Sequence, residues 1–456
     1  MYRKNAWEKY DSKEFKVVMN FAKDYISFLS KSKTERLAVK ESVLLLEAAG
    51  FKNVDSLTSV KSGDKVYFVN KNKNICAFAI GKKPLVEGLR ILGAHIDSPR
   101  LDLKEHPLYE KNGFALADTH YYGGIKKYQW VTIPLALHGV VCKKDGSKVE
   151  VNIGEATSDP VVGISDLLIH LSADQLQKPL AKGIEGENLD VTFGNIPLNG
   201  AKGNPVKANI LKILKKKYDI EEEDLISAEI EVVPAGPARD YGLDSSMIAG
   251  YGHDDRCCAY TSLRAILETG VNEYTSCCVL VDKEEIGSVG ATGAQSLFFE
   301  NAIIKLSTLL GDKHPVYIAR LCLENSKMLS SDVSAAFDPL YASVSDPNNS
   351  AYFANGIVFN KYTGARGKSG SNDSNPEYYA WVRKVMDEGN VNWQNAELGR
   401  VDQGGGGTIA YILGNYNMNV IDAGIPVLNM HAPMEVISKA DLYEAYQGYI
   451  HFLKAE

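Results

Sequence analysis

The spacing of apolar residues along the chain follows two different periods. In residues 13–29 and 34–49 the apolar positions recur every three or four residues, which predicts two amphipathic helices. Thr34 is expected to cap the second helix at its start, and Gly50 to follow its end. Between residues 65 and 81, the sequence VYFVNKNKNICAFAIG predicts a β-hairpin with a polar tip.

Short apolar runs that end in polar residues follow along the chain. LRILGAHIDSPR (89–100), CCVLVDKEEIGSVG (277–290), MLSSDVSAAFDP (328–339) and VLNMHAPME (427–435) have this form. Uninterrupted apolar runs of this length are typical of buried strands. In an open α/β sheet, ligands gather at the carboxyl ends of the strands. The polar residues that end these runs are therefore the first candidates for chemistry.

Helical patterns separate the apolar runs. Helices are expected at residues 256–269 and 291–308, and a last one after Ser438, with Asp441 at the capping-box spacing. Strands that alternate with helices predict an α/β domain, for which we expect a mixed sheet with helices on both faces.

The stretch from 102 to 234 has a different pattern. LALHGVVCKKDGSKVEVNIG predicts a hairpin that turns at Asp145-Gly146, and an alternating strand is expected at 225–233. A chain of 456 residues is too long for one ordinary core. We therefore expect an α/β domain built from residues 1–101 and 235–456, which also holds the polar residues that end the apolar runs, interrupted at 102–234 by a mainly β insertion.

Composition narrows the function further. The chain is 45% hydrophobic and 23% charged, as expected for a globular protein, and its net charge of -7 argues against nucleic acid or an anionic membrane as a partner. The N-terminus has no apolar segment typical of a signal peptide, and no run approaches the length of a membrane span. The seven cysteines include no C-x-x-C, which indicates neither a disulfide framework nor a zinc knuckle and favours the cytoplasm.

Glu284 and Glu285 stand directly after the apolar run 277–281. Two adjacent glutamates are costly to bury unless a cation pairs with them. A metal ion would fill that role, with one carboxylate as a ligand and its neighbour available to move a proton. A solvated acidic turn is the alternative interpretation.

His95 and Asp97 form an H-x-D pair, and on a strand such residues point to the same face. A carboxylate in that position can orient the imidazole of a metal ligand, although a core histidine would use the same partner. Asp254 starts a predicted helix, where it could equally act as a cap. His170 is, on the sequence alone, a packing residue.

The segment KYTGARGKSGSN brings together Lys361, Arg366 and Lys368. It is not a phosphate loop, because the glycine that precedes GKS lies too close to it. This cationic loop is either a mobile surface turn or an anion-binding site.

Imidazole and carboxylate groups at five points of the chain form a candidate metal site, in which no thiolate takes part. The candidate residues are His95, Asp254, Glu284 with Glu285, Asp332 and His431. This donor set suits Zn²⁺, Mn²⁺ or Co²⁺. Five ligands fit a two-metal hydrolytic centre with one bridging carboxylate, and the remaining glutamate would be its base.

The motifs GAHIDSPR, GHDDR, DKEEIGSVG, SSDVSAAFDPLY and NMHAPMEV occur in this order between His95 and Glu435. Together they resemble the aspartyl aminopeptidase family of co-catalytic zinc aminopeptidases. By position, the resemblance implies that His95 and Asp332 hold one metal, that Glu285 and His431 hold the other, and that Asp254 bridges both. It also implies that Glu284 is the general base and that Asp97 orients His95.

The resemblance carries further expectations. In that family a β-rich insertion serves dimerisation, the subunits assemble into dodecamers, and the histidine that corresponds to His170 reaches a neighbouring active site. A lysine near the loop of Lys361, Arg366 and Lys368 pairs with the acidic side chain of the substrate, but here the loop is longer and richer in glycine. We therefore expect a homo-oligomeric aminopeptidase that releases single N-terminal residues from peptides, Asp or Glu among them.

Two other functions use the same residues differently. A metal-dependent deacylase of small N-acyl substrates could use the same five ligands, and activity on N-acetylated amino acids alone would indicate it. A non-enzymatic assembly or cargo protein could keep the fold, and failure to bind metal would indicate that.

Overall fold

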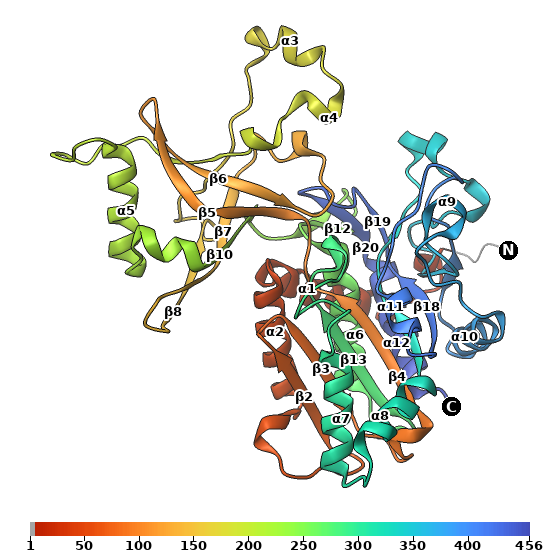
Figure 1. Ribbon diagram of the computed structural model, residues 1–456. Coiled ribbons are helices and arrows are strands. Elements are labelled where there is room, and N and C mark those ends of the chain that lie inside the picture. Colours follow the sequence, from red (N-terminus) through yellow and green to blue (C-terminus); the bar gives the residue numbers. More distant parts are fainter. Residues whose placement is uncertain (1–4) are drawn as a thin grey trace. The chain divides into compact units, whose positions relative to one another are not determined.

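The computed structural model describes residues 5–456, except for the side chains of residues 365 and 366, and it divides into two compact units (Figure 1). The first unit comprises Met1–Asp97, Ala238–Met430 and Glu435–Glu456. The second comprises Ser98–Pro237 and His431–Met434. Helices and strands alternate in the first unit, so the prediction of a mixed α/β fold is confirmed.

The first unit is built on a mixed sheet of nine strands. In spatial order these are β1 (Lys52–Asn53), β2 (Lys65–Asn70), β3 (Asn74–Ala79), β13 (Thr275–Val281), β4 (Leu89–His95), β14 (Lys327–Ser330), β18 (Asn419–Gly424), β16 (Ile357–Asn360) and β17 (Trp393–Asn395). The four central strands β13, β4, β14 and β18 run parallel, while β3 and β16 pair with them in the antiparallel sense. Because β13 and β4 are buried along their whole length, they appear in the sequence as continuous apolar runs.

Helices cover both faces of this sheet and bury a separate apolar core on each. One core is formed with α1 (Ser12–Lys31), α2 (Glu35–Ala48), α6 (His253–Glu268), α10 (Pro376–Glu388) and α12 (Lys439–Lys454). The other is formed with α7 (Phe298–Leu310), α8 (Pro315–Glu324) and α11 (Ala410–Gly414). The short α9 (Ala365–Lys368) lies in the predicted cationic loop.

Helix ends follow their capping signals. The predicted cap at Thr34 is confirmed, since its side chain accepts the N–H of Leu37, and Gly50 adopts a positive φ after α2. Ser438 caps α12 as predicted, but the expected capping box is wrong. Asp441 is buried and instead accepts the backbone N–H groups of Ala354 and Gly356, at 2.7 Å each.

A small third sheet completes the first unit, with β11 (Arg239–Tyr241), β12 (Met247–Gly250), β20 (Glu435–Ser438), β19 (Pro426–Leu428) and β15 (Ser334–Ala335) in spatial order. The predicted helix at 291–308 begins only at Phe298. A side chain at Gly293 would come within 2.1 Å of the carbonyl oxygen of Ser288, so the chain makes a tight turn there first.

The second unit is an antiparallel sheet of six strands. In spatial order these are β8 (Lys148–Ile153), β7 (Leu135–Cys142), β10 (Ala228–Pro234), β5 (Arg100–Lys111), β6 (Phe114–Tyr122) and β9 (Val191–Gly194), and the unit also holds α3 (Ala173–Leu176), α4 (Leu180–Gly183) and α5 (Pro205–Tyr218). The hairpin at Asp145-Gly146 joins β7 to β8 as predicted. The strand expected at 225–233 begins only at Ala228, because residues Glu222–Ser227 form a 3₁₀ helix.

Candidate metal centre

Three neighbouring parallel strands deliver polar side chains to one edge of the main sheet. Strand β4 lies between β13 and β14, and its last residue is His95. Asp332 follows two residues after β14 ends, and Glu284 and Glu285 form a 3₁₀ turn after β13. Asp254 reaches the same place from the start of α6. The sheet therefore brings together residues that are far apart in the sequence.

The imidazole of His95 meets two carboxylates. Its Nε2 lies 3.1 Å from Oδ1 of Asp254 and 3.9 Å from Oδ1 of Asp332. Two ligand atoms on one tetrahedral zinc ion are separated by about 3.3 Å, given bond lengths of about 2.0–2.1 Å. The three side chains are thus spaced as the ligands of a common ion would be.

Asp97 connects the imidazole to the glutamate turn. The Nδ1 atom of His95 lies 3.1 Å from the backbone carbonyl oxygen of Asp97 and 3.3 Å from its carboxylate. The carboxylate accepts the backbone N–H of Glu284 at 3.1 Å and that of Glu285 at 3.2 Å. The turn itself depends on Lys283, which adopts a left-handed conformation with φ 69°. Asp97 therefore fixes the direction of His95 and the position of both glutamates.

Burial and charge shift the ionisation of the cluster. Burial raises the pKa of Asp332 well above its usual range, and Glu284 and Asp254 raise it further although His95 opposes them. Burial lowers the pKa of His95, but hydrogen bonds to Asp254 and Asp97 outweigh that effect and raise the pKa well above its ordinary value. A bound cation would relieve the crowding of carboxylates that produces these shifts.

The residues at this edge fit a divalent metal. His95, Asp254 and Asp332 place their ligand atoms within 4.8 Å of one another. His95 forms a second such group with Glu284 and Glu285. Imidazole nitrogen and carboxylate oxygen are the donors that zinc takes in hydrolytic sites, and His95 already has the outer carboxylate partner typical of a zinc-bound histidine. The site could hold an ion, polarise a carbonyl and place a carboxylate beside a water molecule.

His431 belongs to the second unit. Within that unit, its Nδ1 lies 2.8 Å from the carbonyl oxygen of Gly124. A histidine whose Nδ1 donates to a backbone carbonyl presents Nε2 as its ligand atom.

The residues predicted to bind substrate lie in two places. Lys361 and Lys368 both form ion pairs with Asp373, the second at 3.2 Å. Lys361 lines a cavity of about 720 Å³ to which no side chain of the metal cluster contributes. The side chain of Arg366 lies outside the described part of the structure. His170 is exposed in a short 3₁₀ turn of the second unit, so the packing role considered from the sequence is wrong.

Two further acidic residues hold this site, and sequence reasoning gave neither a role. Asp255 accepts the backbone N–H of His95 at 3.3 Å, and Glu435 accepts that of Asp254 at 3.0 Å. Both carboxyl groups are buried. The signals available in the sequence were the Asp-Asp pair itself and the acidic residue four positions after His431.

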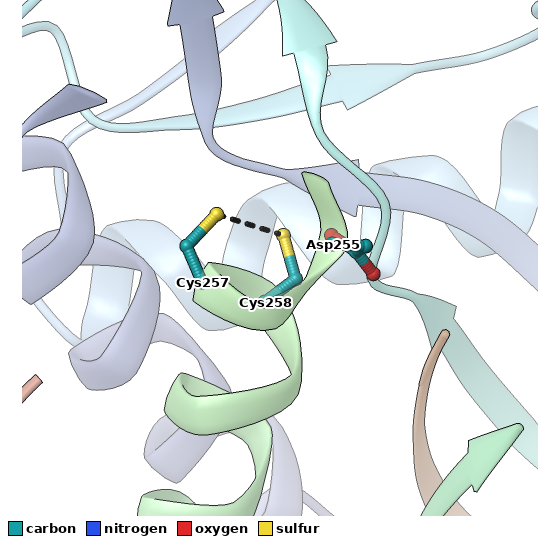
Figure 2. Close-up of side chains that lie close together, drawn as sticks. All are labelled: Asp255, Cys257 and Cys258. Carbon is teal, nitrogen blue, oxygen red and sulfur yellow. Dashed lines mark hydrogen bonds between the residues drawn. The ribbon is translucent and has the colours of Figure 1, made fainter. Parts of the chain in front are cut away.

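Asp255 also forms a compact group with Cys257 and Cys258, whose ligand atoms all lie within 4.8 Å of one another. Figure 2 shows the two thiols side by side near the start of α6, with the carboxylate of Asp255 on the side of Cys258; their sulfur atoms are 4.0 Å apart. Burial raises the pKa of Cys257 to about 11 and that of Cys258 well above its ordinary value. Burial of this kind keeps the thiols protonated and unreactive at neutral pH.

Comparison with known proteins identifies the class. A family model described as Aminopeptidase I zinc metalloprotease (M18) matches residues 28–453. The chain therefore belongs to the M18 family of zinc aminopeptidases, which includes aspartyl aminopeptidase, and the resemblance stated from the motifs is confirmed. As a member of this family it is a hydrolase.

Individual relatives match along almost the whole chain. A probable M18 family aminopeptidase 1 from Clostridium acetobutylicum is 57% identical over 455 residues, which cover 99% of this chain and 98% of the relative. The crystal structure of an M18 aminopeptidase from Thermotoga maritima is similar with a TM-score of 0.96 and 46% identity, covering 100% of this chain and 99% of that one. The crystal structure of aminopeptidase I from Clostridium acetobutylicum has a TM-score of 0.91 and 54% identity, with 99% of each chain covered.

Among the described residues, no helix is both long and apolar enough to cross a membrane.

Proposed function

We propose that this aminopeptidase releases single N-terminal residues from peptides through a centre of two divalent metal ions. The observation that carries the proposal is the contact of His95 with Asp254 and Asp332 at the carboxyl edge of the parallel strands, with Glu284 and Glu285 beside it. His95 and Asp332 would hold one ion, Glu285 and His431 the other, and Asp254 would bridge both. Zinc is the metal we expect, with Mn²⁺ or Co²⁺ as substitutes.

Glu284 is the proposed general base. The bound ions would polarise the scissile carbonyl and lower the pKa of a water molecule. Glu284 would accept the proton of that water on a carboxylate oxygen and pass it to the leaving amine. Asp97 would keep Glu284 in place through the hydrogen bond to its backbone N–H.

Peptides that begin with Asp or Glu are the substrates that the family resemblance implies. Lys361, Arg366 and Lys368 are the cationic residues that would bind an acidic side chain. Asp373 already pairs with both lysines, so an acidic substrate would have to compete with this internal carboxylate. If this competition prevents binding of acidic side chains, the enzyme would prefer neutral N-terminal residues. The proposed hydrolytic mechanism does not depend on that preference.

We further propose that the enzyme acts as a homo-oligomer, and the second unit as its dimerisation domain. The side chains of Leu168, Ile169 and Leu171 are 55%, 68% and 68% exposed on either side of His170. Apolar side chains gathered in this way are typical of a surface that another subunit covers. A yeast relative with 21% identity and a TM-score of 0.77 is described as a dodecamer, and we propose that assembly here too.

The cytoplasm is the proposed location. The seven cysteines form no disulfide within residues 5–456, where all of them lie. Reduced thiols are typical of that compartment.

The decisive experiment is an aminopeptidase assay on a panel of amino-acyl p-nitroanilides, with Zn-, Mn- and Co-loaded protein. Glu284→Gln is the control variant, because it preserves the shape of the side chain and removes the base. We expect turnover on at least one free-amine substrate, and a loss of about 10²–10⁴-fold in Glu284→Gln at unchanged metal content. Hydrolysis of N-acetylated amino acids alone would instead indicate the deacylase, and near-normal rates in Glu284→Gln would refute the base assignment.

A further inference from the structure

The Asp254-Asp255 pair contacts His95 at both ends. Neither residue has helical backbone angles, with ψ 105° at Asp254 and φ -117° at Asp255, so their side chains do not follow the helical spacing. Asp254 reaches Nε2 of the imidazole at 3.1 Å, while Oδ2 of Asp255 accepts the backbone N–H at 3.3 Å. The tip of His95 and its backbone are thus held by consecutive residues of one element.

The N–H of His95 needs this acceptor because the sheet does not provide one. Strand β14 ends at Ser330, whose partner on β4 is Gly93, two residues before His95. On the other side, Ile96 donates to the carbonyl of Val281, so the alternation of the strand turns the N–H of His95 toward the β14 side. A buried N–H without a partner costs free energy, and Asp255 supplies the missing acceptor.

The same helix also contacts the chain next to Asp332. Cys258 and Ser262 are four residues apart, so they lie on one face of α6, and a carboxylate oxygen of Asp255 lies within 4.8 Å of the Cys258 sulfur. The hydroxyl of Ser262 donates to that of Ser331 at 3.2 Å, directly before Asp332. The first turns of α6 therefore contact the backbone of His95 and the side chain that precedes Asp332.

We infer that Asp255 is a positioning residue, whose carboxylate holds the backbone of His95 so that the imidazole points at the metal. The inference rests on the proposed metal centre. Asp255 is completely buried, and its second oxygen, Oδ1, accepts no hydrogen bond from the described residues. Burying a carboxylate costs more free energy than burying Leu or Asn would. The hydrogen bond to the backbone of His95 is a role that explains why an aspartate is present here.

The test compares three variants of the full-length protein. Asp255→Asn keeps an oxygen that can accept the N–H of His95, whereas Asp255→Leu keeps the branching of the side chain, with greater bulk, and removes the acceptor. Asp441→Ala is the matched control, because Asp441 is also a fully buried carboxylate that holds backbone, at Ala354 and Gly356. Zinc affinity is measured by competition with a chromophoric chelator, the cobalt absorption spectrum reports ligand geometry, and thermal unfolding in chelator reports stability.

We expect Asp255→Leu to bind zinc about 10–100-fold more weakly and to show an altered cobalt spectrum. Asp255→Asn should bind zinc with an affinity within about threefold of the wild type, a much smaller change than in Asp255→Leu. Asp441→Ala should unfold at lower temperature yet keep the wild-type affinity and spectrum. Should Asp255→Leu fail to fold, Asp255→Ala makes the same comparison.

Two other results would contradict these expectations, and they can be told apart. If the wild type binds zinc and Asp255→Leu keeps the same zinc affinity and cobalt spectrum, the positioning role alone is overturned. A wild-type protein that binds no zinc would overturn the metal centre, and the inference with it.

Discussion

Replacing Asp97 by Asn tests whether one carboxylate organises both halves of the proposed centre. One oxygen of Asp97 accepts the N–H of Glu284 and lies near Nδ1 of His95, and the other accepts the N–H of Glu285. Asparagine keeps the shape of the side chain but has a single carbonyl oxygen. The NH₂ group of asparagine would face one of the two backbone N–H groups, of Glu284 or Glu285, and two donors cannot bond to each other. One of the two backbone hydrogen bonds must therefore be lost.

The size of the effect follows from the burial of the groups. A hydrogen bond to a charged acceptor contributes about 1.5–3 kcal/mol. Glu284 and Glu285 are only half-buried, so water can partly replace the lost acceptor and the lower end applies, at about 1.5 kcal/mol. Loss of the orienting carboxylate should weaken zinc binding about 10–100-fold, which equals about 1.4–2.7 kcal/mol.

The assay measures zinc affinity by chelator competition, and the unfolding free energy in excess chelator. Asp97→Ala removes both acceptor oxygens and should lose about twice as much stability as Asp97→Asn. Asp441→Ala provides the control for a buried carboxylate away from the cluster. Wild-type zinc affinity in Asp97→Asn would refute the reasoning, because the orientation of His95 and the glutamate turn would then not depend on the carboxylate of Asp97.

Three further predictions concern stability and assembly. Tyr25→Phe should lower the unfolding free energy by about 1–2 kcal/mol in urea, because it removes the buried 2.7 Å hydrogen bond to Nδ1 of His253; an unchanged midpoint would contradict it. Burial lowers the pKa of Lys327 from 10.5 to about 8, so the unfolded chain binds more protons between these values and stability should rise with pH from about 8 to 10.5. Lys327→Met should abolish that rise, as thermal unfolding across the pH range would show. Ile169→Asp should lower the mass of the proposed oligomer as measured by light scattering, and an unchanged mass would argue against the proposed interface.

The helices and strands that the sequence revealed are those with strong local signals. The pattern at residues 13–29 recovered α1, which in fact starts at Ser12 with a capping box between Asp11 and Glu14. The helix expected from residue 291 was wrong at its start, since the turn around Gly293 is set by a backbone contact with Ser288 that no periodicity records. Local pattern identifies the element, but tertiary contacts decide where it begins.

The candidate site divides in the same way. Residues that follow apolar strands could be named from the sequence, because the parallel sheet brings the ends of its strands to one edge. The partners of Asp97 and Asp255 could not, since their hydrogen bonds join positions 187 and 160 residues apart. Nothing in the local sequence shows that Asp255 turns away from Asp254 toward the backbone of His95.

The carboxylates at this edge also couple metal binding to the stability of the fold. Burial raises the pKa values of Asp332 and Asp255 well above their usual range, which means that their ionised forms are disfavoured when no cation is present. Metal ligands must be deprotonated, so an ion that binds here displaces protons and removes this cost. An ion that binds the folded chain but not the unfolded one stabilises the fold in proportion to its affinity. Asp332, whose ionised form weakens this part of the first unit without metal, is thus a residue through which a bound ion would strengthen it.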